Sequence, residues 1–475
     1  MTRISAFLLL LLLVAPGARA TMVQDQWFKV LLDGRKIGQF LSQREIRDER
    51  VFTSQHLDIE LDRAGTRVAM SSTETSEETI DGRPLAFTNV SQMTGNEARV
   101  EGTLDGDRLR VRFRNAGEWQ ERESDWPVGA LLPEGLRLAA ERRPLLSGQQ
   151  DRQLSFMPSS LAAVEITSRV GATETVSLPG GRERLHRVEQ SFAFPGTAIR
   201  STAWVDEHNR IRKLSTPMLG VELVMLECDK ACATAANQPS DVFERTLIVS
   251  PRALRRSELQ SGLRYTFKAR DRGVLKLDDT AEQTVVHKGG QLIVEVRRDA
   301  RPGVGLPPEP SDRAANDWLQ SDAPEVANLA REAAGDSVGD AARMQRLETF
   351  VRGYITNKNL GVGYASALEV VRDPQGDCTE HAVLLAALGR SLGIATRVVD
   401  GLAYAPGFAG VDQVFVPHAW VQAWVDGRWQ SYDAALSGFD AGHIAFSAGD
   451  GDPWRFYHAL DLLGRMQLKK IEALR

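Results

Sequence analysis

The chain has 475 residues, which is enough for about three domains of ordinary size. Hydrophobic residues make up 42% of it and charged residues 25%, a composition typical of a globular protein with a large core. The net charge of −5 at pH 7 provides no basic field that could hold nucleic acid, so we expect no nucleic-acid partner.

Residues 1–20 have the pattern of an export signal. Arg3 gives a positive start, residues 7–14 are apolar, and Ala18-Arg19-Ala20 fits a small-residue cleavage site. The apolar run is shorter than the ~20 residues of an ordinary membrane-spanning helix, although an uncleaved anchor remains the alternative. We therefore predict a cleaved signal peptide and a mature protein that is soluble and periplasmic or secreted.

Residues 21–240 have the pattern of an N-terminal β-rich domain. Apolar and polar residues alternate over 57–61 and again over 108–113. This alternation, with frequent hairpin turns, predicts an antiparallel sandwich or curved sheet with one wet face. A short helix is expected around 134–142. Turn dipeptides recur at 33–34, 81–82, 105–106 and 180–181.

The three cysteines have different surroundings. Cys228 and Cys232 are close enough in sequence to pair in an oxidising compartment, or they are two thiols without a role. Their spacing lacks the second ligand pair of a zinc site, so we predict no metal there. If they pair, Cys378 is left single, and a single cysteine in an exported chain is a candidate reactive thiol.

The second half of the chain changes character. Residues 241–300 look like a smaller β unit, and residues 301–311 are a proline-rich linker, because several prolines together make a stiff spacer. Helical patterns follow: one helix starts at Pro324, a favoured first position, and an amphipathic helix covers 340–355. Residues 312–475 are predicted to form the C-terminal domain.

A nearly all-apolar helix follows the segment Gly-Asp-Cys-Thr-Glu-His-Ala at 376–382. A helix that is apolar all round is enclosed by its domain, and Gly393 marks its end. Asp377 is a plausible N-cap, which places Cys378 in the first turn. There the unpaired N–H groups and the helix dipole favour an anion, so the site suits a thiolate.

A second motif supplies a histidine and a carboxylate. Asp426-Gly427 lies between two runs rich in aromatic and β-branched residues, which is typical of a two-residue hairpin turn. In that register Trp424 faces Trp429, and His418 and Asp433 become diagonal neighbours on one face. The pattern predicts a contact between these two side chains.

Local signals predict the structure of the segments around these motifs. Residues 395–404 read as a strand. The glycine- and proline-bearing stretch 405–417 reads as a loop, either lining a cleft beside His418 or serving as a plain connector. The tail 454–475 looks helical.

Four motifs together resemble the transglutaminase-like superfamily over roughly residues 315–445. They are Gly-Asp-Cys-Thr-Glu-His-Ala at 376–382, Leu-Gly-Ile-Ala-Thr-Arg-Val-Val at 392–399, His-Ala-Trp-Val at 418–421 and Trp-Gln-Ser-Tyr-Asp at 429–433. The resemblance implies an α+β domain with a papain-like fold, a helix packed on an antiparallel sheet. It also implies a triad with the nucleophile Cys378, the base and acid His418 and the orienting residue Asp433, without cofactor or metal. With the export signal, it suggests a bacterial periplasm.

This triad predicts acyl transfer or hydrolysis at amide bonds of proteins or peptides through a thioester intermediate. The alternative is a catalytically silent module of the cell envelope that binds peptides or proteins. A metal site formed by Cys378, His381 and His418 is a weaker rival, because its spacing is too sparse, and His381 is expected to be structural. Whether water or an amine resolves the thioester stays open.

Overall fold

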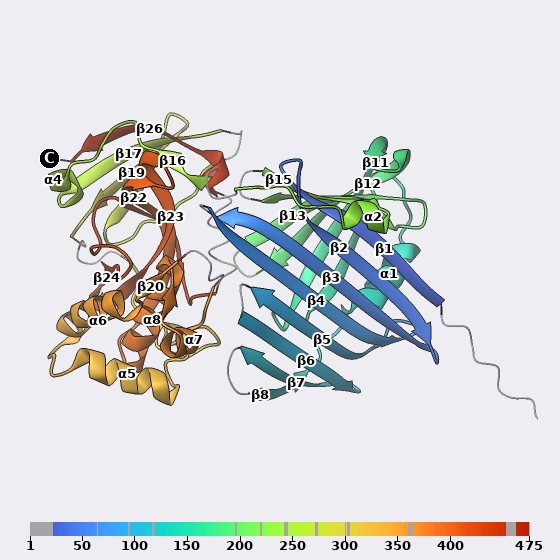
Figure 1. Ribbon diagram of the computed structural model, residues 1–475, viewed down its shortest axis with the longest axis horizontal. Helices are drawn as coiled ribbons and strands as arrows, with labels where there is room; N and C mark the ends of the chain where they lie inside the picture. The colour runs from blue at the N-terminus through green and yellow to red at the C-terminus, as the bar shows by residue number, and fades with distance from the viewer. Residues whose placement is uncertain are drawn as a thin grey trace, which may run out of the picture.

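The computed structural model describes residues 22–474 with internal gaps, and Figure 1 shows them as two bodies side by side. The predicted signal peptide lies outside the described residues. In the described part of the chain, no helix is both long enough and apolar enough to cross a membrane. The gaps are 64, 94–95, 116–118, 195–196, 219–220, 242–245, 271–273, 300, 302–304, 360–363 and 453–461.

The N-terminal body is one 15-stranded sheet, in the order β8-β7-β6-β5-β4-β3-β2-β1-β15-β14-β13-β12-β11-β10-β9. Its neighbouring strands are antiparallel except for β9 and β10, so the predicted antiparallel β-rich region is confirmed. The strands are β1 (Met22–Leu32), β2 (Arg35–Arg47), β3 (Arg50–Arg63), β4 (Thr66–Thr79), β5 (Pro84–Met93), β6 (Asn96–Asp105), β7 (Arg108–Asn115), β8 (Gln120–Asp125), β9 (Ala130–Leu131), β10 (Gln150–Met157), β11 (Ala162–Leu178), β12 (Gly181–Phe194), β13 (Thr197–Val205), β14 (Ile211–Met218) and β15 (Val221–Cys228).

This sheet curls until strands from its two wings touch. Phe87 of β5 and Phe156 of β10 are far apart in the strand order, yet their ring centroids are 5.2 Å apart. Helix α1 (Pro133–Arg142) is fixed to the sheet, because the Glu78 carboxylate accepts hydrogen bonds from the backbone of Glu134 and Gly135 at 2.8 and 2.9 Å. The helix predicted near 134–142 is confirmed.

The last strand of this sheet leads into a short disulfide-closed turn. Cys228 and Cys232 form a disulfide between β15 and α2 (Lys230–Ala233), with their Cα atoms 6.0 Å apart. The pairing that the sequence left open is therefore present, and Cys378 lies outside it.

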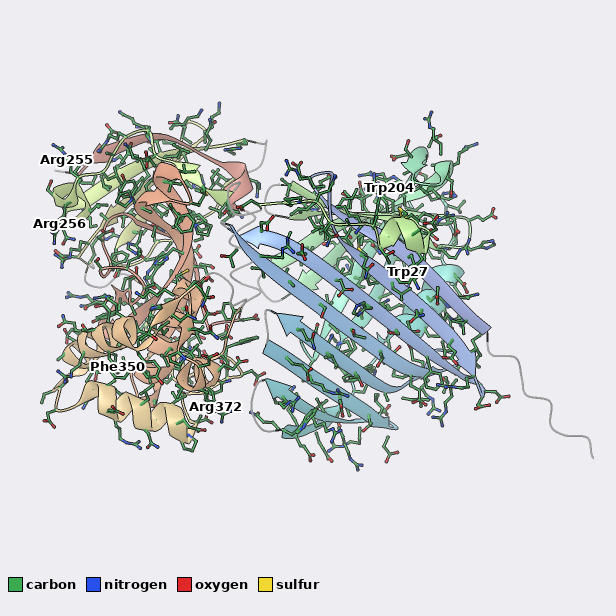
Figure 2. The ribbon with its side chains drawn as sticks, in the orientation of Figure 1. Trp27, Trp204, Arg255, Arg256, Phe350 and Arg372 are labelled. Atoms are coloured by element: carbon green, nitrogen blue, oxygen red, sulfur yellow. A yellow bond between two sulfur atoms is a disulfide. The ribbon has the colours of Figure 1, made fainter. Side chains whose placement is uncertain are left out.

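The C-terminal body contains a sheet covered by helices. The order is β16-β23-β22-β25, with β24 paired to β23. The helices predicted from Pro324 and over 340–355 are confirmed as α5 and α6, and Figure 2 shows Phe350 and Arg372 on this helical side. The elements are α5 (Pro324–Ala334), α6 (Asp340–Tyr354), α7 (Ala367–Arg372), α8 (Cys378–Ser391), β16 (Ile248–Val249), β22 (Thr396–Phe408), β23 (Val411–Val425), β24 (Arg428–Tyr432) and β25 (His443–Gly449).

A second, four-stranded sheet packs against the first. Its order is β18-β19-β17-β26, from β17 (Gly262–Ala269), β18 (Gln283–Lys288), β19 (Gln291–Arg297) and β26 (Met466–Ala473). Tyr265 and Phe267 share a buried cluster with Phe415 and Ile444 of the helix-covered sheet. Residues 262–297 therefore form one core with the C-terminal sheet.

Two local predictions were wrong for the same reason. The tail 454–475 was expected to be helical. Residues 462–465 are helical, but residues 466–473 form β26, which pairs with the edge of β17, and residues 453–461 and 475 lie outside the described residues. The stretch 405–417 was expected to be a loop, but β22 and β23 run through it, with Pro417 opposite Leu402. Backbone pairing with a distant strand overrode the local signals in both places.

Candidate active site

Helix α8 begins at Cys378 and is capped as predicted. The Asp377 side chain accepts a hydrogen bond from the backbone N–H of Thr379 at 2.9 Å. In return, Glu380 Oε2 accepts from the backbone N–H of Asp377 at 2.8 Å, which completes a capping box. Gly393 follows the helix with φ +80°, as its role as a stop requires. These bonds fix the backbone on both sides of Cys378.

Glu380 is the buried acid beneath this helix start. Its Oε1 accepts from the backbone N–H of Ala365 at 2.9 Å and from the Thr379 hydroxyl at 3.0 Å. Burial, with a further contribution from the charge of Asp377, raises the pKa of Glu380 to about 8. The Glu380 carboxyl group is therefore a weaker acid than an exposed glutamate.

Gly376, the first residue of the motif at 376–382, occupies a position where only glycine fits. Its φ is +140°, and a Cβ added there would lie 2.4 Å from Glu380 Cγ. Both the backbone angle and the close approach exclude a side chain. The motif glycine thus makes room for the buried acid that caps α8.

The hairpin has the predicted register. Val425 faces Arg428 and Trp424 faces Trp429 across the turn. Asp426 and Gly427 both have positive φ, at 51° and 74°, as a tight two-residue hairpin turn requires.

His418 and Asp433 meet as the register predicted. His418 Nε2 donates to Asp433 Oδ2 at 2.9 Å, and both side chains are buried. Burial raises the pKa of Asp433, but the charges and hydrogen bonds of His418 and His443 outweigh it and hold the pKa well below the ordinary value. Because Nε2 is bonded to Asp433, Nδ1 is the ring nitrogen of His418 that can act on a thiol.

The register of α8 against the sheet places Cys378 near the same end as His418. The Thr396 hydroxyl donates to the carbonyl of Ala386 at 2.9 Å, and β22 runs back along α8 from there. From that bond, Cys378 is ~12 Å back along the helix. Gly401, which pairs with His418, is ~16 Å along the strand in the same direction.

Two further observations tie the helix start to the dyad. Cys378 packs against the hydrophobic cluster that contains Ala419 and Ala434, the chain neighbours of His418 and Asp433. Burial lowers the pKa of His381, one turn after Cys378, while the charge of Asp433 acts on it in the opposite direction. The first turn of α8 and the dyad therefore share one electrostatic environment.

His443 is the residue at this site that the sequence analysis missed. Its Nε2 donates to Asp433 Oδ2 at 3.0 Å, and its Nδ1 lies 3.2 Å from both the carbonyl and Oδ1 of Asp440. Burial lowers the pKa of His443, but the bonds to the two aspartates outweigh it and raise the pKa to about 9. No motif covers this histidine; the one available signal was a second histidine ten residues after Asp433.

Within the ranges that the structure describes, Cys378, His381 and His418 do not form a group whose donor atoms could hold a metal ion. His381 Nδ1 lies 2.5 Å from the carbonyl of Asp377, a contact within its own helix end, which fits a structural role. Among the described residues, the group whose donor atoms lie close together is His418, Asp433 and His443. Their separations of 2.9 and 3.0 Å are ordinary N–H···O hydrogen-bond lengths.

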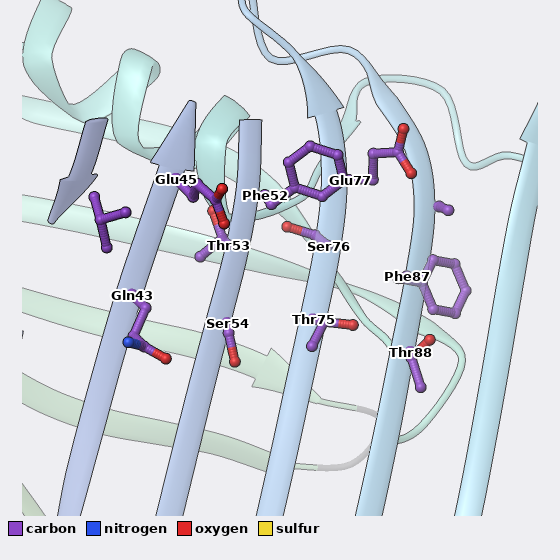
Figure 3. A pocket seen from close by; sticks show the side chains of 12 residues that line it. Gln43, Glu45, Phe52, Thr53, Ser54, Thr75, Ser76, Glu77, Phe87 and Thr88 are labelled. Carbon is purple, nitrogen blue, oxygen red and sulfur yellow. The ribbon is translucent and has the colours of Figure 1, made fainter. Parts of the chain in front are cut away.

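A separate hollow of about 350 Å³ lies on the curled sheet. Figure 3 shows its wall: Gln43, Ser54, Thr75 and Thr88 stand on neighbouring strands β2 to β5, with Phe52 and Phe87 nearby. Its lining holds no cysteine or histidine, so it offers a binding surface rather than a nucleophile with a base.

Comparison with known proteins gives one family and several distant structures. Residues 327–434 match the model of the transglutaminase-like superfamily, and no curated protein matches the chain. A β-barrel-like protein of unknown function from Brucella abortus is 14% identical, with 43% of this chain and 95% of that chain covered and a TM-score of 0.34.

Two other solved structures carry the names of proteases. A "putative cysteine protease" from Cytophaga hutchinsonii is 16% identical, covering 45% of this chain and 84% of that one, with a TM-score of 0.29. A "putative protease" from Parabacteroides distasonis is 9% identical, covering 75% and 69%, with a TM-score of 0.20. Because all three TM-scores are below 0.5, we take nothing about activity from these structures.

Proposed function

We propose, from the premise that this chain carries a transglutaminase-like domain over residues 327–434, that it is a cysteine enzyme acting on amide bonds of proteins or peptides. The observation that carries the proposal is the buried His418–Asp433 hydrogen bond of 2.9 Å, at the end of the sheet where α8 presents Cys378. A nucleophile, a base and an orienting carboxylate are the three parts that such chemistry needs.

The reaction runs in two halves. The Cys378 thiolate attacks the amide carbonyl carbon, the C–N bond breaks, and His418 gives its proton to the departing amine. A water molecule or a second amine then loses a proton to His418 and attacks the thioester. This step releases the acid or a new amide and restores the thiol.

The surroundings suit this charge separation. The depressed pKa of Asp433 keeps it ionised, so it holds the His418 tautomer and stabilises the imidazolium. The N-terminus of α8 favours the thiolate and, through the Cys378 backbone N–H, the oxyanion of the tetrahedral intermediate.

The tryptophans bear on the choice between hydrolysis and transfer. Trp420 lies beside the dyad, with ring centroids 6.2 Å from His418 and 5.2 Å from His443, and helps to exclude water there. Trp429 instead packs with Ala281 and donates to the carbonyl of Leu306 at 2.9 Å, which is a core role. One shielding tryptophan is compatible with both outcomes, so the proposal covers acyltransferase and peptidase or amidase activity as one class.

Export to an oxidising compartment is part of the same proposal. The disulfide between Cys228 and Cys232 supports it, because such bonds persist in oxidising compartments. The mass of the protein expressed in a bacterial host shows whether residues 1–20 have been removed. A protein that keeps these residues would contradict the proposal.

The decisive experiment measures thiol reactivity and then turnover. We expect iodoacetamide to alkylate Cys378 at pH values well below those at which an ordinary thiol reacts. The His418→Ala variant should lose this low-pH reactivity. Incubation with a peptide library, with and without a primary amine, then separates hydrolysis from transfer. An ordinary thiol profile that His418→Ala leaves unchanged would remove the enzyme proposal.

The second candidate is a module that binds proteins or peptides without turnover. The polar hollow on β2 to β5 favours it, because it gives the larger body a surface of its own. This reading predicts peptide binding that survives Cys378→Ala and an inert Cys378, which the same alkylation experiment detects.

A further inference from the structure

We propose that His443 is a positioning residue of this site, a buried imidazolium that clamps Asp433 opposite His418 and takes up part of its charge. This inference rests on the proposed function, because it concerns how the His418–Asp433 dyad is tuned. It assigns a role to a histidine outside the expected triad and to the β unit that holds it.

The Asp433 carboxylate is held from four directions. Its Oδ1 accepts from the backbone N–H groups of Ala435 and Leu436 at 2.8 and 3.1 Å. Its Oδ2 accepts from His418 at 2.9 Å and from His443 at 3.0 Å. Without His443, the side of Oδ2 away from His418 would lose its partner, and the carboxylate could turn.

The groups that face His443 explain why it carries a charge. Its Nδ1 has two acceptors on Asp440, the carbonyl and Oδ1, each at 3.2 Å. A proton on each ring nitrogen therefore meets an aspartate. The backbone N–H of Asp440, 3.3 Å from Nδ1, could donate to it only in the neutral ring.

The remaining neighbours of His443 are of mixed character. The rings of Trp420 and Phe439 lie 5.2 and 5.0 Å away and exclude water. From α6, Glu348 accepts from the backbone N–H of Asp433 at 2.7 Å and is close enough for the charge of His443 to act on it. Asp433 and Asp440 favour the protonated form of His443 and outweigh the burial, which by itself disfavours it.

The four-stranded sheet unit fixes the loop that presents His443. The Tyr265 hydroxyl donates to the carbonyl of Ala441 at 2.6 Å. Gln283 donates to the carbonyl of Ala445 and accepts from its N–H, both at 2.9 Å. All these groups are buried, so the residues that read as a separate small β unit act as the support of His443.

A cation at this position should lower the basicity of the dyad. The rings of His418 and His443 are 5.6 Å apart, so protonation of His418 places two positive charges close together. Removing the charge of His443 while keeping a donor to Asp433 should therefore move the pH dependence of Cys378 alkylation to higher pH, by about one pH unit.

The test is the pH profile of iodoacetamide alkylation of Cys378 in the full-length protein. His443→Gln keeps a donor at the position of Nε2 and removes the charge. We expect the high-pH limb of its plot of alkylation rate against pH to move up by about one pH unit. The plateau of the alkylation rate should stay within about threefold of wild type. His443→Ala should show the same shift and a plateau at least tenfold lower.

The outcomes are separable from failure of the proposed function. If the wild-type profile depends on His418 but His443→Gln leaves the limb in place, the role of His443 is overturned and the enzyme proposal stands. If His418→Ala changes nothing in the wild-type profile, the proposed function itself fails.

Two further measurements keep the proposal falsifiable if the variants do not fold. Imidazole nitrogen NMR of the wild-type protein should show His443 protonated on both nitrogens at pH 7, and a neutral ring overturns the proposal. Metal analysis of the purified protein should find no stoichiometric ion; one equivalent that chelation removes, with loss of the His443 signal pattern, would make this a metal site instead.

Discussion

Trp424 and Trp429 face each other across the β23–β24 hairpin, with ring centroids 5.6 Å apart. This pair fixes the register that brings Asp433 diagonally to His418. A slip of one residue would turn Asp433 to the other face of the hairpin, because side chains alternate along a strand. The geometry of the candidate site therefore depends on a two-residue turn that is not itself part of the site.

That dependence predicts the effect of changing the turn. Gly427→Val places a β-branched residue at φ 74° and should lower the free energy of unfolding by roughly 1–3 kcal/mol. Urea unfolding of the full-length protein measures it. Gly427→Asn, which tolerates this angle, serves as the control and should cost less; equal costs would show that the turn angle does not matter.

Asp433→Asn should abolish most of the activity and also lower stability, because both oxygens of Asp433 accept hydrogen bonds and one end of the amide would meet donors. An asparagine cannot stabilise the His418 imidazolium, and we expect a loss of about 100-fold or more in the rate of acyl-enzyme formation. Single-turnover kinetics with an activated ester measures it. Asp440→Asn is the matched control, because Asp440 contacts His443 and not His418. A near-normal Asp433→Asn rate would contradict the assigned role.

His443 should make stability depend on pH. Its pKa of about 9 in the folded protein lies above the ordinary 6.5, so the folded state binds the proton more tightly. The stabilisation is complete below pH 6.5 and is lost as the pH rises through 9, on the order of 3 kcal/mol at most. Unfolding measured at pH 6 and pH 9.5 should show this loss in wild type, whereas His443→Gln should lack it.

Tyr265→Phe tests the link between the four-stranded sheet and the site. The change removes the hydroxyl that donates to the buried carbonyl of Ala441, and should cost about 1–3 kcal/mol by leaving that carbonyl unsatisfied. Hydrogen exchange over 440–446 should become faster. Tyr404→Phe is the control, because the Tyr404 hydroxyl accepts from the backbone N–H of Leu254 and not from the loop, so its loss should leave 440–446 protected.

Glu380→Gln should weaken the start of α8. Both carboxyl oxygens accept hydrogen bonds, so one end of the amide would place an N–H group against another donor. We expect a loss of about 1–3 kcal/mol and slower alkylation of Cys378. Calorimetry and the alkylation rate measure the two effects, and a variant as stable and reactive as wild type would show that the capping box is dispensable.

The sequence by itself determined the features that depend on near neighbours. Asp377 as a cap, Gly393 as a stop and Asp426-Gly427 as a turn each act within a few residues. Helix α8 and the His418–Asp433 contact therefore followed from spacing alone.

The tertiary structure decided what depends on distant partners. Residues 466–473 of the tail became strand β26 because β17 offered them an unpaired edge, and β22 and β23 run through the expected loop because they pair with each other. His443 reached Asp433 because Tyr265 and Gln283 hold its loop from another sheet. Hydrogen bonds between segments far apart in the chain set these arrangements, and no local pattern encodes which segment will supply the partner.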